Sequence, residues 1–209
     1  MAELTARGSR LLVVKVGGSL AETGRLKTAL AMIRAARRPV VVVPGGGPFA
    51  DGVRDLQAAM NFDDAVAHRL AMLAMHQMAE LMVSLQDGLQ VAQSLDEIAD
   101  VVGRGQAPVW APLLTMAKDA TIPADWSATS DSLAARLAEL LGGVRLVLLK
   151  SVDVEKEDSL EELARRGVVD PAFPAIVTRA GLSWSVFGPR NDARLAAVLA
   201  GEEAGEANS

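Results

Sequence analysis

The chemistry that the sequence first suggests is phosphate binding at a lysine followed closely by two glycines. The segment Lys15-Val16-Gly17-Gly18-Ser19 follows four apolar residues that begin at Leu11. Glycines at such a place let backbone N–H groups approach phosphate oxygens, and Lys15 adds positive charge. A lysine there is costly to bury unless it meets an anion or leaves the strand end. An ordinary strand-to-helix turn explains the glycines equally well on local sequence alone.

A second glycine-rich segment, Pro44-Gly45-Gly46-Gly47-Pro48-Phe49-Ala50-Asp51, follows the apolar run from Val40 to Val43. Consecutive glycines lose much chain entropy on folding, so a simple turn rarely needs three of them. We therefore favour close approach to a ligand. Neither segment contains G-x-x-x-x-G-K-[ST] or G-x-G-x-x-G, so the sequence predicts neither a P-loop of that type nor a dinucleotide-binding loop.

Two carboxylates near these segments are candidate site residues, and each has a structural alternative. Asp131 could act in the site, or it could cap a helix together with Thr129 and Ser130. Asp51 could bind a ligand, or it could stabilise a helix N-terminus.

Arg54, His68 and His76 complete the set of polar candidates. Arg54 could bind an anion through its guanidinium or belong to a solvated helix face. His68 could reach a ligand pocket, and a structural role is equally compatible with its position. His68 and His76 are not one helical turn apart, so the sequence predicts no zinc site.

The elements that must position these residues alternate between strands and helices. Strands are expected at Leu11–Val16, Val40–Val43, Leu89–Ala92, Val109–Leu114, Arg145–Leu149, Ala175–Val177 and Ser185–Phe187. Helices are expected at Leu26–Arg37, Asp51–Met60, Asp64–Leu85, after the Ser94 cap, and at Ser132–Leu141, Leu160–Arg166 and Asp192–Leu199. This alternation predicts an α/β fold: a three-layer α/β/α sandwich with a mostly parallel sheet, in one domain over residues 1–200. Ligands of such folds bind at the carboxyl ends of the strands.

The two glycine segments, taken together, resemble the amino acid kinase superfamily. Lys-x-Gly-Gly-Ser on a first strand and Val-Val-Val-x-Gly-Gly-Gly-Pro on a second are its phosphate loops. Thr129-Ser130-Asp131-Ser132-Leu133-Ala134-Ala135 resembles the start of a family helix, and Leu148-Leu149-Lys150-Ser151-Val152-Asp153 resembles its nucleotide-holding strand and loop. The resemblance runs from about residue 11 to 200. The family includes kinases of N-acetylglutamate, aspartate, uridylate, carbamate and isopentenyl phosphate.

The resemblance implies a role for each matching position. Lys15 would contact the transferring phosphate, and Asp131 would orient Lys15. Phosphate and ATP binding would fall to Gly17, Gly18, Ser19, Lys150, Ser151 and Asp153. Acceptor binding would fall to Gly45, Gly46, Gly47, Asp51, Arg54 and His68. The implied cofactors are ATP and a Mg²⁺ ion bound through the ATP phosphates rather than by protein ligands.

A narrower resemblance concerns the segment after the glycine triplet. Gly-Gly-Gly-Pro-Phe-Ala-Asp, with Val53-Arg54-Asp55 and Asp64-x-x-x-His68 after it, is similar to a short branch found in methanogens and methylotrophs. That branch accompanies methanofuran synthesis, and its characterised activity phosphorylates 5-(aminomethyl)furan-3-yl methyl phosphate. Isopentenyl phosphate kinases carry a histidine where this chain has Asp51, and an acidic residue would suit an acceptor with an amine.

The sequence also departs from the family. The Gly-Gly-Met segment that precedes a second catalytic lysine is missing, so Lys150 or Lys156 would have to replace it. The nucleotide loop reads Val152-Asp153-Val154-Glu155-Lys156 instead of Val-Asp-Gly-Val-Tyr. These departures leave two alternatives to a kinase: a non-catalytic nucleotide- or oxyanion-binding protein, and a regulatory subunit that dimerises with a catalytic paralogue.

Composition limits the possible partners and compartments. The net charge is −5 and the basic residues are scattered, which disfavours a nucleic-acid partner. No apolar run is long enough to span a membrane, Met1 to Arg10 resembles no secretory signal, and cysteine is absent, so we expect a cytoplasmic protein. Residues 201–209 are expected to form a flexible tail.

The segment Asp64–Leu85 carries two apolar stripes, although a helix that covers a sheet needs one. One stripe is Val66, Leu70, Leu73, Gln77 and Leu81, and the other is Met72, Met75, Ala79 and Met82. We expect a partner subunit to cover the second stripe, in a homodimer or larger homo-oligomer. A further layer from the same chain is the alternative.

Overall fold

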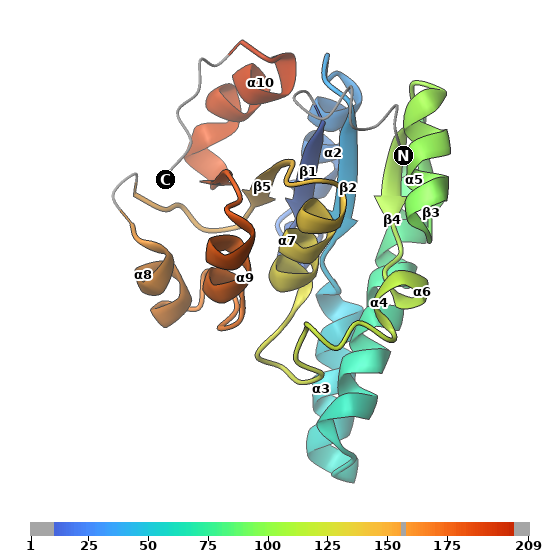
Figure 1. Cartoon of the computed structure of the whole chain (residues 1–209), viewed down its shortest axis with the longest axis vertical. Coiled ribbons are helices and arrows are strands. Elements are labelled where there is room, and N and C mark those ends of the chain that lie inside the picture. Colours follow the sequence, from blue (N-terminus) through green and yellow to red (C-terminus); the bar gives the residue numbers. More distant parts are fainter. Residues whose placement is uncertain (1–10, 156–157, 203–209) are drawn as a thin grey trace.

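The computed structural model describes residues 11–155 and 158–202, and these form a six-stranded sheet with helices on both faces (Figure 1). The strands are β1 (Leu12–Val16), β2 (Val40–Pro44), β3 (Leu89–Ala92), β4 (Ala107–Trp110), β5 (Arg145–Leu149) and β6 (Trp184–Phe187). They lie in the order β3-β4-β2-β1-β5-β6, and every pairing is parallel. The predicted α/β fold class is therefore confirmed.

The helices divide between the two faces of the sheet. The helices are α2 (Leu26–Arg34), α3 (Gly47–Met60), α4 (Asp64–Leu85), α5 (Leu95–Gly103), α6 (Leu113–Met116), α7 (Ser130–Leu140), α8 (Leu160–Arg165), α9 (Phe173–Ala180) and α10 (Asp192–Ala200). Short 3-10 turns, η1 (Gly18–Leu20) and η2 (Pro189–Asn191), follow β1 and β6. One buried core joins α5, α7, α8 and α9 to the sheet, and the other joins α2 and α10 to its opposite face.

Strand β1 shows how alternation assigns side chains to these two cores. Leu12, Val14 and Val16 belong to the core beneath α2 and α10, whereas Val13 faces α7. Since successive side chains of a strand point to opposite faces, Lys15 must point to the α7 side with Val13. The sheet thus directs the one charged residue of β1 toward the N-terminus of α7.

Strand β1 lies where the chain switches from adding strands on one side of the sheet to adding them on the other. From β1 the chain continues to β2 on one side, and after β4 it crosses through α7 to β5 on the other side. Ligands of parallel sheets bind at such a switch point, beyond the carboxyl ends of the strands. The loops after β1, β2 and β5 meet there.

Several expected elements differ from the structure in type or in their bounds. Ala175–Val177 is helical, because Phe173, Ile176 and Val177 form one buried helical stripe within α9 and an apolar run that short does not identify a strand. The strand expected at Val109–Leu114 ends at Trp110, and Pro112 caps the short α6. Helix α3 begins at Gly47 rather than Asp51, with Pro48 in its first turn, as proline allows. Helix α2 ends at Arg34 rather than Arg37.

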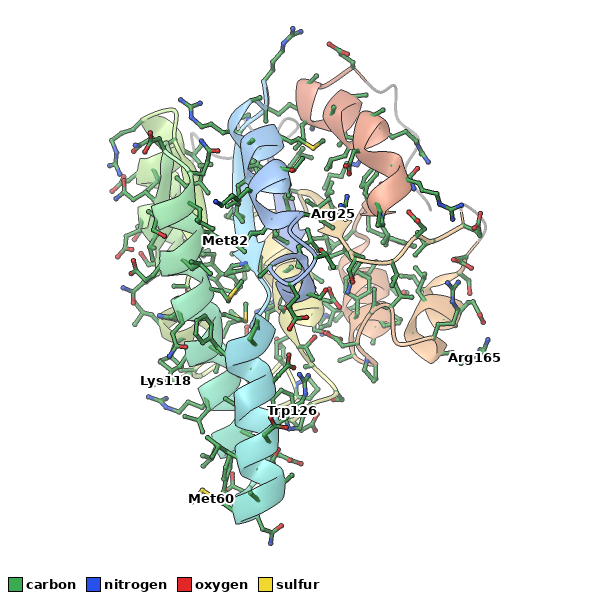
Figure 2. All side chains as sticks on the ribbon, turned by 180° about the vertical axis from the view of Figure 1, so that it is seen from behind. Arg25, Met60, Met82, Lys118, Trp126 and Arg165 are labelled. Atoms are coloured by element: carbon green, nitrogen blue, oxygen red, sulfur yellow. The ribbon has the colours of Figure 1, made fainter. Side chains whose placement is uncertain are left out.

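The two stripes of α4 have different environments. Met72, Met75, Ala79 and Met82 are buried against the sheet, whereas Val66, Leu73, Gln77 and Leu81 are exposed. In Figure 2, Met82 lies near the sheet, and Met60 marks the end of α3 that projects away from it. The alternative to a partner subunit, a further layer from the same chain, is absent over this stripe in the residues that the structure describes.

No helix among residues 11–155 and 158–202 has the length and apolarity needed to cross a membrane. Three predictions fall outside these ranges: the nature of Met1–Arg10, the role of Lys156, and most of the tail, residues 203–209.

Candidate active site

Two lysines and one aspartate form a buried cluster at the carboxyl ends of β1 and β5. Lys15 Nζ lies 2.9 Å from Asp131 Oδ1, in an ion pair. Lys150 Nζ donates a hydrogen bond to Asp131 Oδ2 over 2.7 Å. Lys15 and Asp131 are only 5% and 4% exposed. Two ammonium groups therefore share one carboxylate, which leaves the cluster with net positive charge.

The register of the sheet explains why the two lysines meet. Lys15 pairs with Leu148 and Val16 pairs with Leu149, so Lys150 comes directly beyond the paired residues. Leu148 belongs to the core beneath α7, and Lys150, two positions further along, points to the same face. Asp131 lies in the first turn of α7, above both strands.

Burial and mutual repulsion make Lys150 an unusual lysine. Burial, followed by the nearby Lys15 ammonium, lowers the pKa of Lys150 to about 8, although Asp131 acts in the opposite direction. Burial opposes ionisation of Asp131, but the two lysines outweigh this and hold its pKa below the ordinary value. Near neutral pH the cluster is therefore charged, with Lys150 close to its titration range.

The two glycine loops pack directly against each other. A Cβ atom on Gly18 would lie 2.2 Å from Gly47 N, and one on Gly45 would lie 2.4 Å from Gly18 N. Gly45 N also donates to Val16 O over 2.8 Å, which joins the two strand ends. Gly47 adopts φ +53, a conformation that favours glycine. Close approach of one loop to the other thus requires the glycines even without a ligand, a reason that the sequence interpretation had not included.

A pocket of about 220 Å³ opens beside these loops. It is lined by Gly18, Ser19 and the glycine triplet, by polar Asp51, Arg54 and His68, and by the apolar Met72, Met75 and Leu133. The N-terminus of α3 begins in its wall at Gly47. Because the first N–H groups of a helix lack intrahelical acceptors, this end can bind an oxyanion.

The outer part of the pocket holds an arginine between a carboxylate and an aromatic ring. Arg54 donates to Asp51 Oδ1 over 3.0 Å, and its guanidinium lies 4.2 Å from the Trp126 ring centroid. Trp126 Nε1 donates to Gln57 Oε1 over 2.6 Å, which orients the ring beside α3 (Figure 2). The expected residues Asp51 and Arg54 are thus adjacent, and Trp126 is a neighbour that sequence reasoning missed. Nothing in the local sequence around Trp126 indicates this contact.

The two histidines of α4 have different surroundings. His68 lines the pocket and is half-buried. Burial lowers the pKa of His68, against an opposing effect of Asp125. His76 Nε2 accepts a hydrogen bond from Leu113 N over 3.1 Å, which is a structural role that ties α6 to α4.

The loop after β5 lies on the opposite side of the cluster. Ser19 Oγ donates to Ser151 Oγ over 3.0 Å, so the β1 and β5 loops are in contact. Asp153 accepts hydrogen bonds from Arg190 N and Arg190 Nε, each over 2.9 Å, and these bonds lower its pKa. Arg190 also lines a second hollow of about 340 Å³ together with Phe187 of β6, Arg194 of α10 and residues that follow β5. Of the expected nucleotide residues, Lys150 shares Asp131 with Lys15 and Ser151 contacts Ser19, whereas Asp153 is held by Arg190, which the sequence had not indicated.

A further buried carboxylate that sequence reasoning missed, Asp170, binds the start of α7. It accepts hydrogen bonds from Thr129 N and Ser132 N over 2.8 and 3.0 Å. Asp170 stands before a proline between two helices, so its local sequence resembles that of a turn. No sequence signal links it to Asp131.

The site fits a chain of phosphates. The glycines of the two loops leave their backbone N–H groups uncovered by side chains, so these groups can approach phosphate oxygens. The lysine cluster supplies positive charge. Among residues 11–155 and 158–202, no three His, Cys, Asp or Glu side chains are grouped to hold a metal ion.

Comparisons with known proteins agree with this geometry. Residues 10–165 match the amino acid kinase family. The [5-(aminomethyl)furan-3-yl]methyl phosphate kinase of Methanocaldococcus jannaschii is 22% identical, over 91% of this chain and 93% of that protein. The uridylate kinase of Archaeoglobus fulgidus has a TM-score of 0.63 at 18% identity, over 90% of this chain and 95% of that one. An isopentenyl phosphate kinase has a TM-score of 0.60 at 15% identity, over 92% and 97%. Because the family match spans most of the chain, this protein belongs to the amino acid kinase family and is a kinase.

Proposed function

We propose that this kinase transfers a phosphoryl group from ATP to a small phosphorylated metabolite at the Lys15–Asp131–Lys150 cluster. The observation that carries the proposal is the position of the cluster. Ser130, next to Asp131 in sequence, lines the glycine-lined pocket, and Lys150 leads into the β5 loop, whose Val154 and Glu155 line the second hollow. An acceptor in the pocket and a nucleotide over the β5 loop would both approach the two lysines.

Positioning and charge neutralisation are the main demands of phosphoryl transfer, and these residues can meet both. ATP, when bound with Mg²⁺, supplies the transferable phosphoryl group. Lys15 and Lys150 would neutralise oxygens on either side of that group, and Asp131 would hold both ammonium groups in place. Gly45 to Gly47 and the N-terminus of α3 would orient the acceptor oxyanion. Lys150 would take the place of the family's second lysine.

The acceptor that we favour is 5-(aminomethyl)furan-3-yl methyl phosphate or a close analogue. The M. jannaschii relative is named for this substrate. In the present pocket, Arg54 is held by Asp51 and by the Trp126 ring and would contact the acceptor phosphate, whereas the acidic Asp51 would suit the acceptor amine. An apolar wall of Met72 and Met75 would contact a ring.

The test is ATP turnover by the purified protein with Mg²⁺ and a panel of acceptors. The panel holds aminomethylfuran phosphate, isopentenyl phosphate, uridylate, carbamate, aspartate and N-acetylglutamate. We expect turnover with the furan phosphate. Lys15→Ala should lower kcat by about 10²- to 10³-fold with unchanged circular dichroism, since one group that stabilises developing charge is lost. Turnover with another acceptor would keep the kinase and refute the substrate, whereas ATP binding without turnover on any acceptor would favour a binding protein.

The same proposal includes a homodimer formed through the exposed stripe of α4. Val66, Leu73 and Leu81 present apolar surface to solvent along one side of the helix. Leu81→Asp should yield a monomer in light scattering after size exclusion, because a charge in an apolar interface is unfavourable. Val152→Asp, at an exposed valine of the β5 loop, is the control and should leave the dimer intact. A wild-type monomer at micromolar concentration would contradict the proposal.

A further inference from the structure

Asp170 joins the N-termini of two helices beside the lysine cluster. Its Oδ2 accepts from Thr129 N and Thr129 Oγ1, each over 2.8 Å, and from Ser132 N over 3.0 Å. Its Oδ1 accepts from Phe173 N over 3.0 Å and from the hydroxyl of Ser132. The residue is 7% exposed. Both oxygens are thus saturated by donors from α7 and α9.

The partners of this carboxylate are all neutral. A buried charge usually requires a counter-ion or several hydrogen bonds, and here hydrogen bonds and two helix N-termini meet the requirement. Thr129, the N-cap of α7, makes no capping bond of its own, and its hydroxyl donates to Asp170 instead. A residue distant in sequence therefore caps α7.

Asp170 binds residues on both sides of Asp131 in the sequence. Thr129 precedes Asp131 and Ser132 follows it directly, and both are bound through their backbone N–H groups. Asp131 must keep Oδ1 on Lys15 and Oδ2 on Lys150 at the same time. A small rotation of the first turn of α7 would break one of these contacts.

We propose that Asp170 is a positioning residue, which fixes the first turn of α7 so that Asp131 bridges Lys15 and Lys150. As far as it concerns phosphoryl transfer, this inference rests on the proposed function. The effect on the cluster itself can be measured without turnover, because Lys150 reports the position of Asp131. The charged groups that face the Lys150 amine are Asp131 and Lys15, and Arg25 binds its backbone carbonyl.

The first measurement is the titration midpoint of Lys150, from competitive acetylation at a series of pH values with mass spectrometry. Asp170→Asn has one acceptor oxygen and an amide donor in place of the carboxylate, so it cannot satisfy donors on both sides. We expect the Lys150 midpoint to fall, in the direction given by Asp131→Asn, since a displaced Asp131 carboxylate stabilises the Lys150 ammonium less. Ser94→Ala, which removes the cap of α5, is the control and should leave the midpoint unchanged.

The double variant Asp131→Asn, Asp170→Asn distinguishes a positioning effect of Asp170 from a direct electrostatic effect of its charge on Lys150. If Asp170 acts through Asp131, then adding Asp170→Asn to Asp131→Asn should cause no further fall. A similar fall in both backgrounds, or an unchanged midpoint in folded Asp170→Asn, would overturn the proposal. Should Asp170→Asn fail to fold, Ser132→Ala removes one donor and keeps the charge. It should lower the midpoint by a smaller amount, and no change there would equally overturn the proposal.

The second measurement is turnover per folded molecule. Asp170→Asn should lower kcat by about ten- to a hundredfold with the KM for ATP nearly unchanged, as expected for a misplaced site group. Ser94→Ala should keep wild-type kcat while lowering thermal stability. Wild-type kcat in folded Asp170→Asn would also overturn the proposal. An inactive wild type whose Lys150 midpoint still responds to Asp170→Asn would refute the proposed function and leave Asp170 as the residue that positions Asp131.

Discussion

Lys150 should make the stability and the activity of this protein respond to pH in opposite directions. Burial and the Lys15 ammonium lower the pKa of Lys150 from 10.5 to about 8 in the folded protein. In the unfolded chain the amine should titrate near its ordinary value. Between these two values the unfolded state binds one proton more than the folded state, so the free energy of unfolding must rise with pH.

The size of this effect follows from the separation of the two pKa values. Each pKa unit corresponds to about 1.4 kcal/mol, so moving from pH 7 to pH 9.5 should stabilise the folded protein by about 2 kcal/mol through Lys150. Below pH 8 the folded protein carries the full unfavourable contribution of the charged amine, about 3 kcal/mol. Asp131 is the single carboxylate that pairs with both ammonium groups, so it cannot fully offset the cost of burying two positive charges.

The assay is urea denaturation of the wild type and Lys150→Met at pH 7 and pH 9.5. Methionine keeps most of the volume and removes the titrating group, so the difference between the two proteins isolates Lys150. The absence of cysteine removes thiol oxidation as a complication at high pH. Lys150→Met should be more stable than the wild type at pH 7, and this advantage should shrink by about 2 kcal/mol at pH 9.5.

Activity should follow the opposite course. The value of kcat/KM for ATP reports groups of the free enzyme, so it should fall about tenfold per pH unit above pH 8 as Lys150 loses its charge. Lys150→Met should be nearly inactive at every pH. A stability difference between the two proteins that is constant from pH 7 to pH 9.5, or that widens, would refute the reasoning about this cluster.

Two further predictions concern the glycine loops and the acceptor pocket. Gly18→Ala should abolish most activity, because the new Cβ would lie 2.2 Å from Gly47 N and force the loops apart. Gly103→Ala, whose Cβ would meet nothing within 4 Å, should retain wild-type turnover, and equal losses in both variants would contradict this account. Arg54→Ala should raise the KM for the acceptor by about tenfold while leaving the KM for ATP unchanged, as loss of one charged contact implies. Arg69→Ala, at an exposed position of α4, is its control and should leave both KM values unchanged. An altered KM for ATP in Arg54→Ala would contradict the assignment of Arg54 to the acceptor pocket.

Local sequence determined much of the sheet and both glycine loops. The apolar runs of β1, β2 and β5 are nearly continuous because these strands are covered on both faces. Gly17 follows β1, and β2 ends at Pro44. Short apolar runs were ambiguous, as Ala175–Val177 illustrates, because periodicity cannot distinguish a strand from one turn of helix over so few residues. Strand β4 ends at Trp110, two residues before Pro112, which lacks the N–H that a ladder hydrogen bond requires and begins α6.

Tertiary structure alone decided which charged groups meet. Lys15, Asp131 and Lys150 come from three separate elements, and their contact depends on strand register and on the packing of α7. The same holds for Asp170, which caps a helix distant in sequence. The stripes of α4 were visible as a pattern, but only the packed sheet showed that the methionines are covered and the leucines are exposed. Sequence patterns reflect each residue's local surroundings, whereas a buried ion cluster depends on how segments far apart in the chain pack together.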